Sequence, residues 1–132
     1  MTAFLHLGIV ASTVLACAGD GTGPQSGTIS SDGGLYLLDV QMSPDPPVAG
    51  PATLTVTVTE AATDQVVGDA SLAVDPWMPE HGHGLSEAPV VDGQAGVFTA
   101  SFAYTMPGAW ELRFDLDGSP GADTAAMSVE VE

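Results

Sequence analysis

Apolar and polar residues alternate along most of the chain beyond residue 34. In the segment 52–60, ATLTVTVTE, the side chains of Leu54, Val56 and Val58 fall on one face and the threonines fall on the other. A period of two is the pattern of a β-strand with one buried face. The same alternation predicts strands over 97–104, 109–116 and 126–132, and a looser alternation predicts strands over 34–42 and 66–74.

Turn-forming residues separate these segments. Proline, glycine and aspartate gather at 44–51, 92–93, 106–108 and 117–121, and no helical periodicity follows the N-terminal leader. Six to seven short strands joined by such turns predict an all-β fold, an antiparallel β-sandwich of immunoglobulin-like topology. Trp110 lies in the middle of an alternating strand, so we expect it to pack in the core.

The N-terminal residues have a different character. Residues 1–16 contain an apolar run that is shorter than a membrane-spanning helix and ends in small residues, as in a signal peptide. The end of this run, Val-Leu-Ala before Cys17, resembles the lipobox of bacterial lipoproteins, which implies lipidation of Cys17. An ordinary secretory signal, or a buried N-terminal helix with a chance cysteine, is the alternative. Residues 17–34, rich in Gly, Ser and Thr, are expected to form a flexible tether of about 20 Å, followed by the sandwich domain over 35–132.

The charge of the chain restricts its partners. Seventeen acidic residues face one basic residue, Arg113, and the formal net charge is −16 at pH 7. Nucleic acid is not an expected partner, because phosphate binding needs lysine and arginine. An anionic membrane surface would repel the domain, so the lipid anchor is the only membrane contact expected. The acidity permits binding of a cation without specifying a site.

The segment 75–84, DPWMPEHGHG, carries the strongest candidate chemistry. His81 and His83 are two of the three histidines in the chain, and the third lies in the leader. If the segment is extended, residues two apart project to the same side, so both rings can reach one ion. Gly82 and Gly84 allow the backbone to curl around it. The alternative is a solvent-exposed loop without a ligand.

Two methionines complete the candidate metal site. Met78 precedes His81 by three residues, and Met106 precedes a turn at the end of another predicted strand. Imidazole and thioether ligands favour copper, and we expect Cu(I) first, with Cu(II) or Zn(II) as alternatives. Trp77 is expected to shield the ion or stack beside it. Alternatively, Trp77 and Met78 cap the core, and Met106 is an ordinary buried side chain.

These motifs resemble those of the YtkA-like domain family. The sequence Met78-Pro-Glu-His-Gly-His-Gly, followed by Met106-Pro-Gly-Ala-Trp, is similar to the family's Met-Pro-x-Met-x-His-Gly loop and its later Met-x-Gly-x-Trp. The resemblance covers residues 35–132 and implies an extracytoplasmic immunoglobulin-like domain related to copper-handling periplasmic proteins. Met78, His83 and Met106 match the pattern, whereas His81 stands where the family usually shows methionine.

Two functions follow from these observations. The first is a copper-binding lipoprotein of the cell envelope, on its periplasmic or outer face, that acts as a carrier, buffer or metallochaperone and delivers the metal to an envelope protein. The second is a non-metal interaction or assembly module that docks through a sandwich edge or the loop 44–51. No nucleophile motif is present, because the segment from Gly84 to Ala88 lacks the second glycine of a nucleophile elbow, so we do not expect an enzyme.

Overall fold

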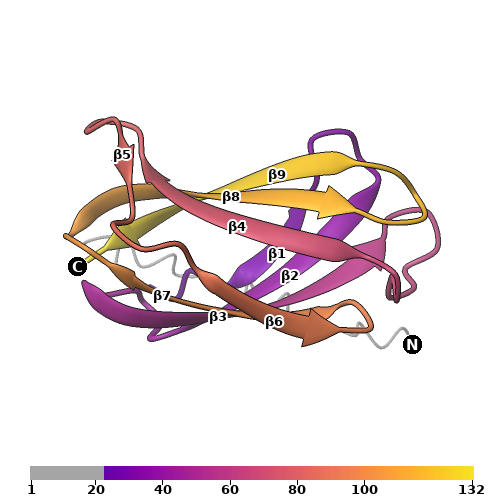
Figure 1. Ribbon diagram of the computed structural model, residues 1–132, viewed down its shortest axis with the longest axis horizontal. Coiled ribbons are helices and arrows are strands. Elements are labelled where there is room, and N and C mark those ends of the chain that lie inside the picture. The colour runs from indigo at the N-terminus through magenta and orange to yellow at the C-terminus, as the bar shows by residue number, and fades with distance from the viewer. Residues whose placement is uncertain (1–22) are drawn as a thin grey trace, which may run out of the picture.

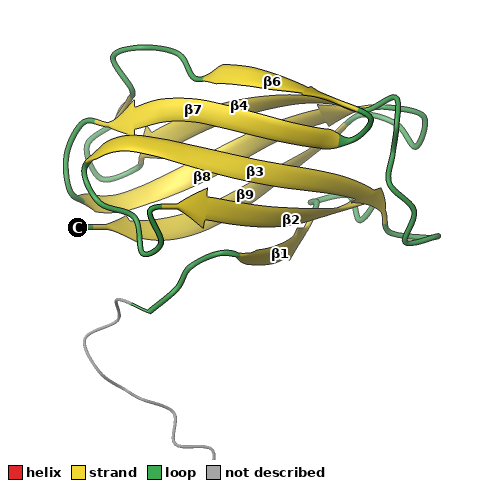
Figure 2. Cartoon of the chain, turned by 90° about the horizontal axis from the view of Figure 1, so that it is seen from below, coloured by secondary structure: helices red, strands yellow, loops and turns green. Residues whose placement is uncertain are grey.

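Two antiparallel sheets pack face to face in a computed structural model that describes residues 23–132 (Figure 1). The first sheet contains, in spatial order, β1 (Gly27–Ser30), β2 (Tyr36–Ser43), β3 (Gly50–Glu60), β7 (Val97–Tyr104) and β6 (Val90–Gln94). The second contains β5 (His83–Gly84), β4 (Ser71–Met78), β8 (Gly108–Asp117) and β9 (Asp123–Val131). Figure 2 shows the first sheet in front of the second.

The strand order is that of the immunoglobulin fold. If the strands from β2 to β9 take the letters A, B, C, C′, D, E, F and G, the first sheet has the order A-B-E-D and the second C′-C-F-G. The strand β1 adds one edge strand beside A. The predicted all-β, immunoglobulin-like sandwich is therefore confirmed, although residues 23–132 form nine strands instead of the expected six to seven.

The core follows the alternation in the sequence. Leu54, Val56 and Val58 on β3 are fully buried, and they face the second sheet, where Trp110 and Leu112 are also buried. The intervening residues of β3 and β8 are exposed or half-buried. Period-two alternation was thus a reliable guide to which side chains enter the core, and Trp110 lies there as expected.

The ordered domain begins earlier than the expected boundary at Leu35. Residues 27–30 form β1 and pair with residues 37–40 of β2, and the backbone N–H of Asp32 donates a hydrogen bond to the carbonyl of Thr124 at 2.7 Å. Ile29 packs against the core from this strand. The segment 27–34 is therefore part of the sandwich and not of the tether, because backbone pairing at a sheet edge needs few apolar side chains.

Two further expectations were wrong in detail. The strand expected over 66–74 is β4, shifted to 71–78, and Val66 forms only an isolated bridge with Thr59. β5 pairs only with Trp77 and Met78 of β4. Pro76 therefore has no partner strand on the β5 side, where its missing N–H group costs no hydrogen bond. The 92–93 pair lies inside β6; the turn follows at Ala95 and Gly96, whose positive φ angles of 55° and 80° suit a two-residue hairpin loop.

Three expectations concern the N-terminal residues. The signal peptide over 1–16, lipidation of Cys17 and the first part of the tether lie outside the described residues. Within residues 23–132, no helix is long and apolar enough to cross a membrane.

Candidate metal centre

The four predicted ligands lie at one end of the sandwich. Met78 ends β4, His81 lies in the following turn, His83 begins β5, and Met106 lies in the turn between β7 and β8. Figure 1 shows both turns at the end of the molecule that also holds the C-terminus. We call this end, made of residues 78–86 and 104–110, the His/Met end.

A tight hairpin turn, and not an extended segment, brings the two histidines together. The N–H groups of His81 and Gly82 donate hydrogen bonds to the Met78 carbonyl at 3.2 and 2.9 Å, and Met78 pairs with His83. Gly82 has a φ of 68°, in the left-handed region where glycine carries no steric penalty. The expected extended conformation was therefore wrong, and the turn places both rings on the tip of the hairpin.

The histidine rings have a separation suited to a shared ion. Both side chains are exposed, and the ring centroids of His81 and His83 are 5.7 Å apart with planes inclined at 33°. With metal–nitrogen bonds of ~2.0 Å, two imidazoles on a common ion have their centroids about 5–6 Å apart. The pair thus fits one small ion by its spacing.

A backbone contact fixes which nitrogen of His83 is available. Its Nδ1 lies 3.1 Å from the carbonyl oxygen of Gly84. A carbonyl oxygen only accepts hydrogen bonds, so Nδ1 carries the proton and neutral His83 presents the lone pair of Nε2. Metal-binding histidines usually have their second nitrogen held in this way. The Gly84 carbonyl therefore holds the His83 ring in one orientation and leaves Nε2 free of this contact.

Met78 lies beneath this pair. It is directly opposite His83 in the pairing of β4 with β5, so the two side chains share one face of the sheet. The Met78 side chain is 1% exposed, and a Cβ atom on Gly108 would lie 3.0 Å from its Cε. The absence of a side chain at Gly108 thus lets the thioether of Met78 lie against the start of β8.

Trp110 contacts both the backbone of Met106 and the ring of His83. The Met106 side chain is half-buried against the core, and its carbonyl accepts a hydrogen bond of 3.0 Å from the Trp110 Nε1. The ring centroid of Trp110 lies 6.5 Å from that of His83, nearly perpendicular to it at 76°. One indole therefore links the turn that carries Met106 to the hairpin that carries the histidines.

Trp110, and not Trp77, is the tryptophan beside His83. Trp77 pairs with Gly84, one position from the Met78 and His83 pair, so its side chain is on the opposite face of the sheet. There the Arg113 guanidinium lies 5.1 Å from its ring centroid. The expectation that Trp77 shields the ion was wrong; Trp110, to which we assigned only a core role, packs against His83. The sequence indicates only that Trp110 falls on the same face of β8 as the other buried residues of that strand.

Carboxylates do not complete a site at this end. No group of three or more His, Cys, Asp or Glu side chains within residues 23–132 is arranged to hold a metal ion. The other soft donor groups at this end are the thioethers of Met78 and Met106. Two imidazoles and two thioethers suit a soft ion better than a hard one, which fits Cu(I).

The His/Met end also buries a polar group that the sequence did not single out. The Tyr104 hydroxyl is buried and forms no hydrogen bond with any described residue. Its ring packs edge-on against Trp110, with centroids 5.4 Å apart, and burial raises the pKa of the phenol well above its usual range. An alternating strand predicts that Tyr104 is buried but cannot show that its hydroxyl lacks a partner.

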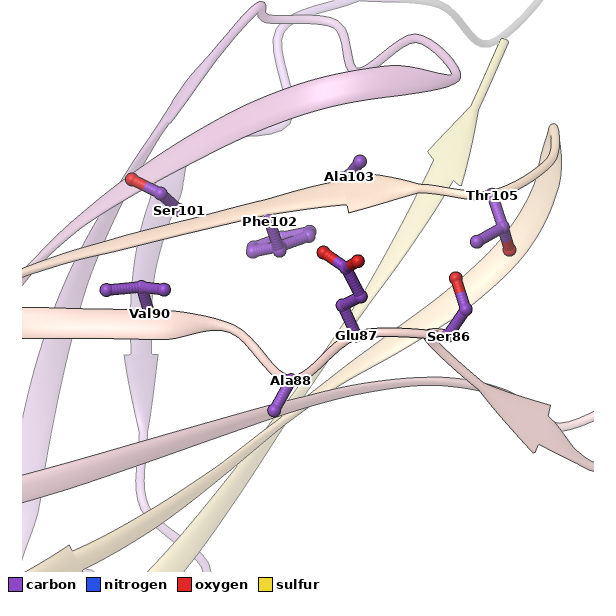
Figure 3. A pocket seen from close by; sticks show the side chains of 8 residues that line it. All are labelled: Ser86, Glu87, Ala88, Val90, Ser101, Phe102, Ala103 and Thr105. Atoms are coloured by element: carbon purple, nitrogen blue, oxygen red, sulfur yellow. The ribbon is translucent and has the colours of Figure 1, made fainter.

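A cavity of about 300 Å³ has Ser86 and Thr105 among the residues that line it (Figure 3). It lies between the segment 86–90 and the end of β7, and its walls include Glu87, Phe102 and Thr105. No sequence motif predicts this cavity, because its walls come from two segments that no motif connects.

This geometry defines a class of domain: an immunoglobulin-like sandwich that carries a histidine pair and two methionines at one end. The sequence model of the YtkA-like family matches residues 29–115. The chain therefore belongs to the YtkA-like family, as its motifs indicated. No curated protein matches the chain significantly.

Proposed function

We propose that this protein binds copper at the His/Met end and serves as a carrier, buffer or metallochaperone in the cell envelope. The observation that carries the proposal is the histidine pair, 5.7 Å apart, with His83 oriented by the Gly84 carbonyl. Membership of the YtkA-like family supports the same function. In this proposal the protein is a binding protein and not an enzyme.

The four side chains have distinct roles in the proposed site. The exposed imidazoles of His81 and His83 capture the ion from solution through their nitrogen atoms. The thioethers of Met78 and Met106 supply softer ligands from below, which favours Cu(I) over Zn(II). Trp110 covers one side of His83 and restricts the access of water.

The location of the protein is part of the proposal. Lipidation of Cys17 would hold the domain on the periplasmic or outer face of a membrane, and an envelope protein would receive the metal. An acylated Cys17 is not available as a thiolate ligand, so the site depends on imidazole and thioether groups.

A competition titration tests the metal site. The purified protein and the double variant His81→Ala, His83→Ala are each titrated with Cu(I) against a chromogenic chelator, and then with Cu(II) and Zn(II). Loss of one good ligand costs at least ~1.4 kcal/mol, so we expect the double variant to bind Cu(I) at least about tenfold more weakly. Equal competition by the two proteins would refute the proposal.

Matched methionine variants test the sulfur ligands. Met106→Leu keeps the volume of a half-buried side chain and removes its sulfur, and Met127→Leu does the same on β9. Weaker Cu(I) binding is expected for the first variant only. If both variants bind Cu(I) like the parent protein, Met106 is not a ligand.

The alternative function, a non-metal assembly module, would be favoured by ligands that point to separate surfaces. The four residues instead lie at one end of the sandwich, where Trp110 packs against the His83 ring and donates a hydrogen bond to the Met106 carbonyl. This arrangement supports the metal-binding function over the alternative.

A further inference from the structure

The cavity beside the His/Met end contains a carboxylate with no counter-ion. Glu87 lines the cavity, and its carboxylate points from the segment after β5 toward β7 (Figure 3). The one ion pair among residues 23–132 joins Arg113 to Glu111, at 2.8 Å on the outer face of the second sheet. Arg113 is also the only lysine or arginine of the entire chain. Apart from the histidines, this protein therefore has no basic side chain available to neutralise Glu87.

The other walls of the cavity suit a planar cation with an apolar stem. Phe102 and Val90 supply apolar surface, and the hydroxyls of Ser86 and Thr105 supply hydrogen-bond acceptors. A guanidinium group has five N–H donors, pairs with a carboxylate and stacks on aromatic rings. At about 300 Å³ the cavity is at the lower limit of ligand pockets, which span ~300–1,000 Å³.

The edge of β7 beside the cavity is unpaired. The pairing of β6 with β7 ends at Val90 and Ser101, and beyond it Phe102 to Tyr104 pair only with β3. The segment 86–89 turns away from β7 at this point, and the cavity fills the space between them (Figure 3). An unpaired strand edge is a place where an extended peptide can add backbone hydrogen bonds.

We propose that this cavity is a docking site for an arginine side chain of another protein, carried on an extended segment that lies along the open edge of β7. The net charge of −16 attracts a basic partner. A second copy of this chain is an unsuitable partner, since it carries the same net charge of −16 and a single arginine. The wall residues Ser86 and Thr105 are close in sequence to His83 and Met106, so a docked partner would lie beside the proposed copper site.

The proposal is tested on metal-free protein, so its outcome is independent of copper binding. A blocked pentapeptide, Ala-Val-Arg-Val-Ala, is titrated into isotope-labelled protein and followed by amide chemical shifts. We expect saturable shifts at Phe102, Ala103 and Thr105. Replacing the peptide arginine by citrulline, which keeps the shape and removes the charge, should abolish them.

Two glutamate variants separate the cavity from the general acidity. Glu87→Gln removes one charged group from an exposed position and should weaken peptide binding about tenfold, the loss of one charge-assisted interaction. Glu130→Gln makes the same change at an exposed position of β9, in the other sheet and outside the cavity walls, and should bind like the parent. Equal binding by both variants, or no saturable shift at millimolar peptide, would overturn the proposal. The copper titration would be unaffected by that result.

Discussion

The two ends of the sandwich each bury a tyrosine, and they treat its hydroxyl differently. Tyr36 is fully buried, and its hydroxyl donates a hydrogen bond to the carbonyl of Gly121 in the loop between β8 and β9. Tyr104 is 2% exposed at the His/Met end, and its hydroxyl has no partner among the described residues. Burial raises the pKa of both phenols. Only one of the two hydroxyls helps to hold a loop in place.

The same contrast extends to the neighbouring polar groups. At the end opposite the His/Met end, the Asp123 carboxylate accepts hydrogen bonds from the Ser31 hydroxyl at 2.6 Å and from the backbone N–H groups of Gly33, Leu35 and Thr124. These bonds tie the turn between β1 and β2 to the start of β9. We call this the Asp123 end.

This difference between the two ends distinguishes polar groups that stabilise the fold from polar groups that remain available to bind a ligand. The Asp123 end uses its donors and acceptors within the chain, so they contribute to stability. At the His/Met end, the Nε2 atom of His83 and the Glu87 carboxylate have no hydrogen-bond or ion-pair partner among residues 23–132. Changes at the Asp123 end should therefore alter folding, and changes at the His/Met end should alter binding.

The largest expected effect on stability comes from Ser31. It is 4% exposed, and its hydroxyl accepts from the N–H of Tyr36 at 2.9 Å while donating to Asp123. Ser31→Ala leaves buried groups unpaired and should lower the free energy of unfolding by ~1–3 kcal/mol, measured by urea denaturation. Ser30→Ala removes an exposed hydroxyl and is the control, with a change within ~0.5 kcal/mol. Equal losses of stability in Ser31→Ala and Ser30→Ala would contradict a stabilising role for the Ser31 hydroxyl.

The two tyrosines should respond in opposite directions. Tyr36→Phe removes the bond to Gly121 and should destabilise the protein by ~0.5–1.5 kcal/mol. Tyr104→Phe removes a hydroxyl that has no described partner, so stability should stay constant or rise by up to ~1 kcal/mol. Thermal unfolding of the metal-free variants measures both. A clear loss of stability in the second variant would show that its hydroxyl is satisfied.

A smaller difference is expected in acid. The hydrogen bond from Ser31, with those from backbone N–H groups, lowers the pKa of Asp123 from 3.8 to about 2. A carboxylate with a lowered pKa contributes stability above its ordinary pKa, and this contribution is lost as the pH falls from 3.8 toward 2. The unfolding midpoint of Asp123→Asn should therefore vary less over this range than that of the parent. Parallel curves for the two proteins would contradict the assignment.

The smallest expected effect on folding comes from the histidines. His81 and His83 are exposed, so the double alanine variant should keep the stability of the metal-free parent within ~0.5 kcal/mol. The same variant is expected to lose Cu(I) affinity. The residues that bind the metal and the polar groups that stabilise the fold would then lie at opposite ends of the molecule. A large loss of stability without metal would show that the hairpin depends on the imidazoles.

Much of the candidate site was present in the sequence as residue types and short spacings. His-Gly-His within one loop predicted two neighbouring imidazoles, and the Met-Pro motifs predicted the family. The site's remaining features depend on contacts across the fold. Trp110 reaches His83 only because β8 pairs with β4, and the cavity forms only because β6 stops pairing with β7 at Ser101.

The sequence by itself determined the fold class and the buried face of each main strand, because alternation is a local property that every strand carries along its own length. It also determined which soft ligands are available. The tertiary structure decided that Trp110 and not Trp77 adjoins the histidines, that Tyr36 gains a partner and Tyr104 does not, and that residues 27–34 join the domain. These outcomes depend on register and packing between strands distant in sequence, which no local pattern specifies.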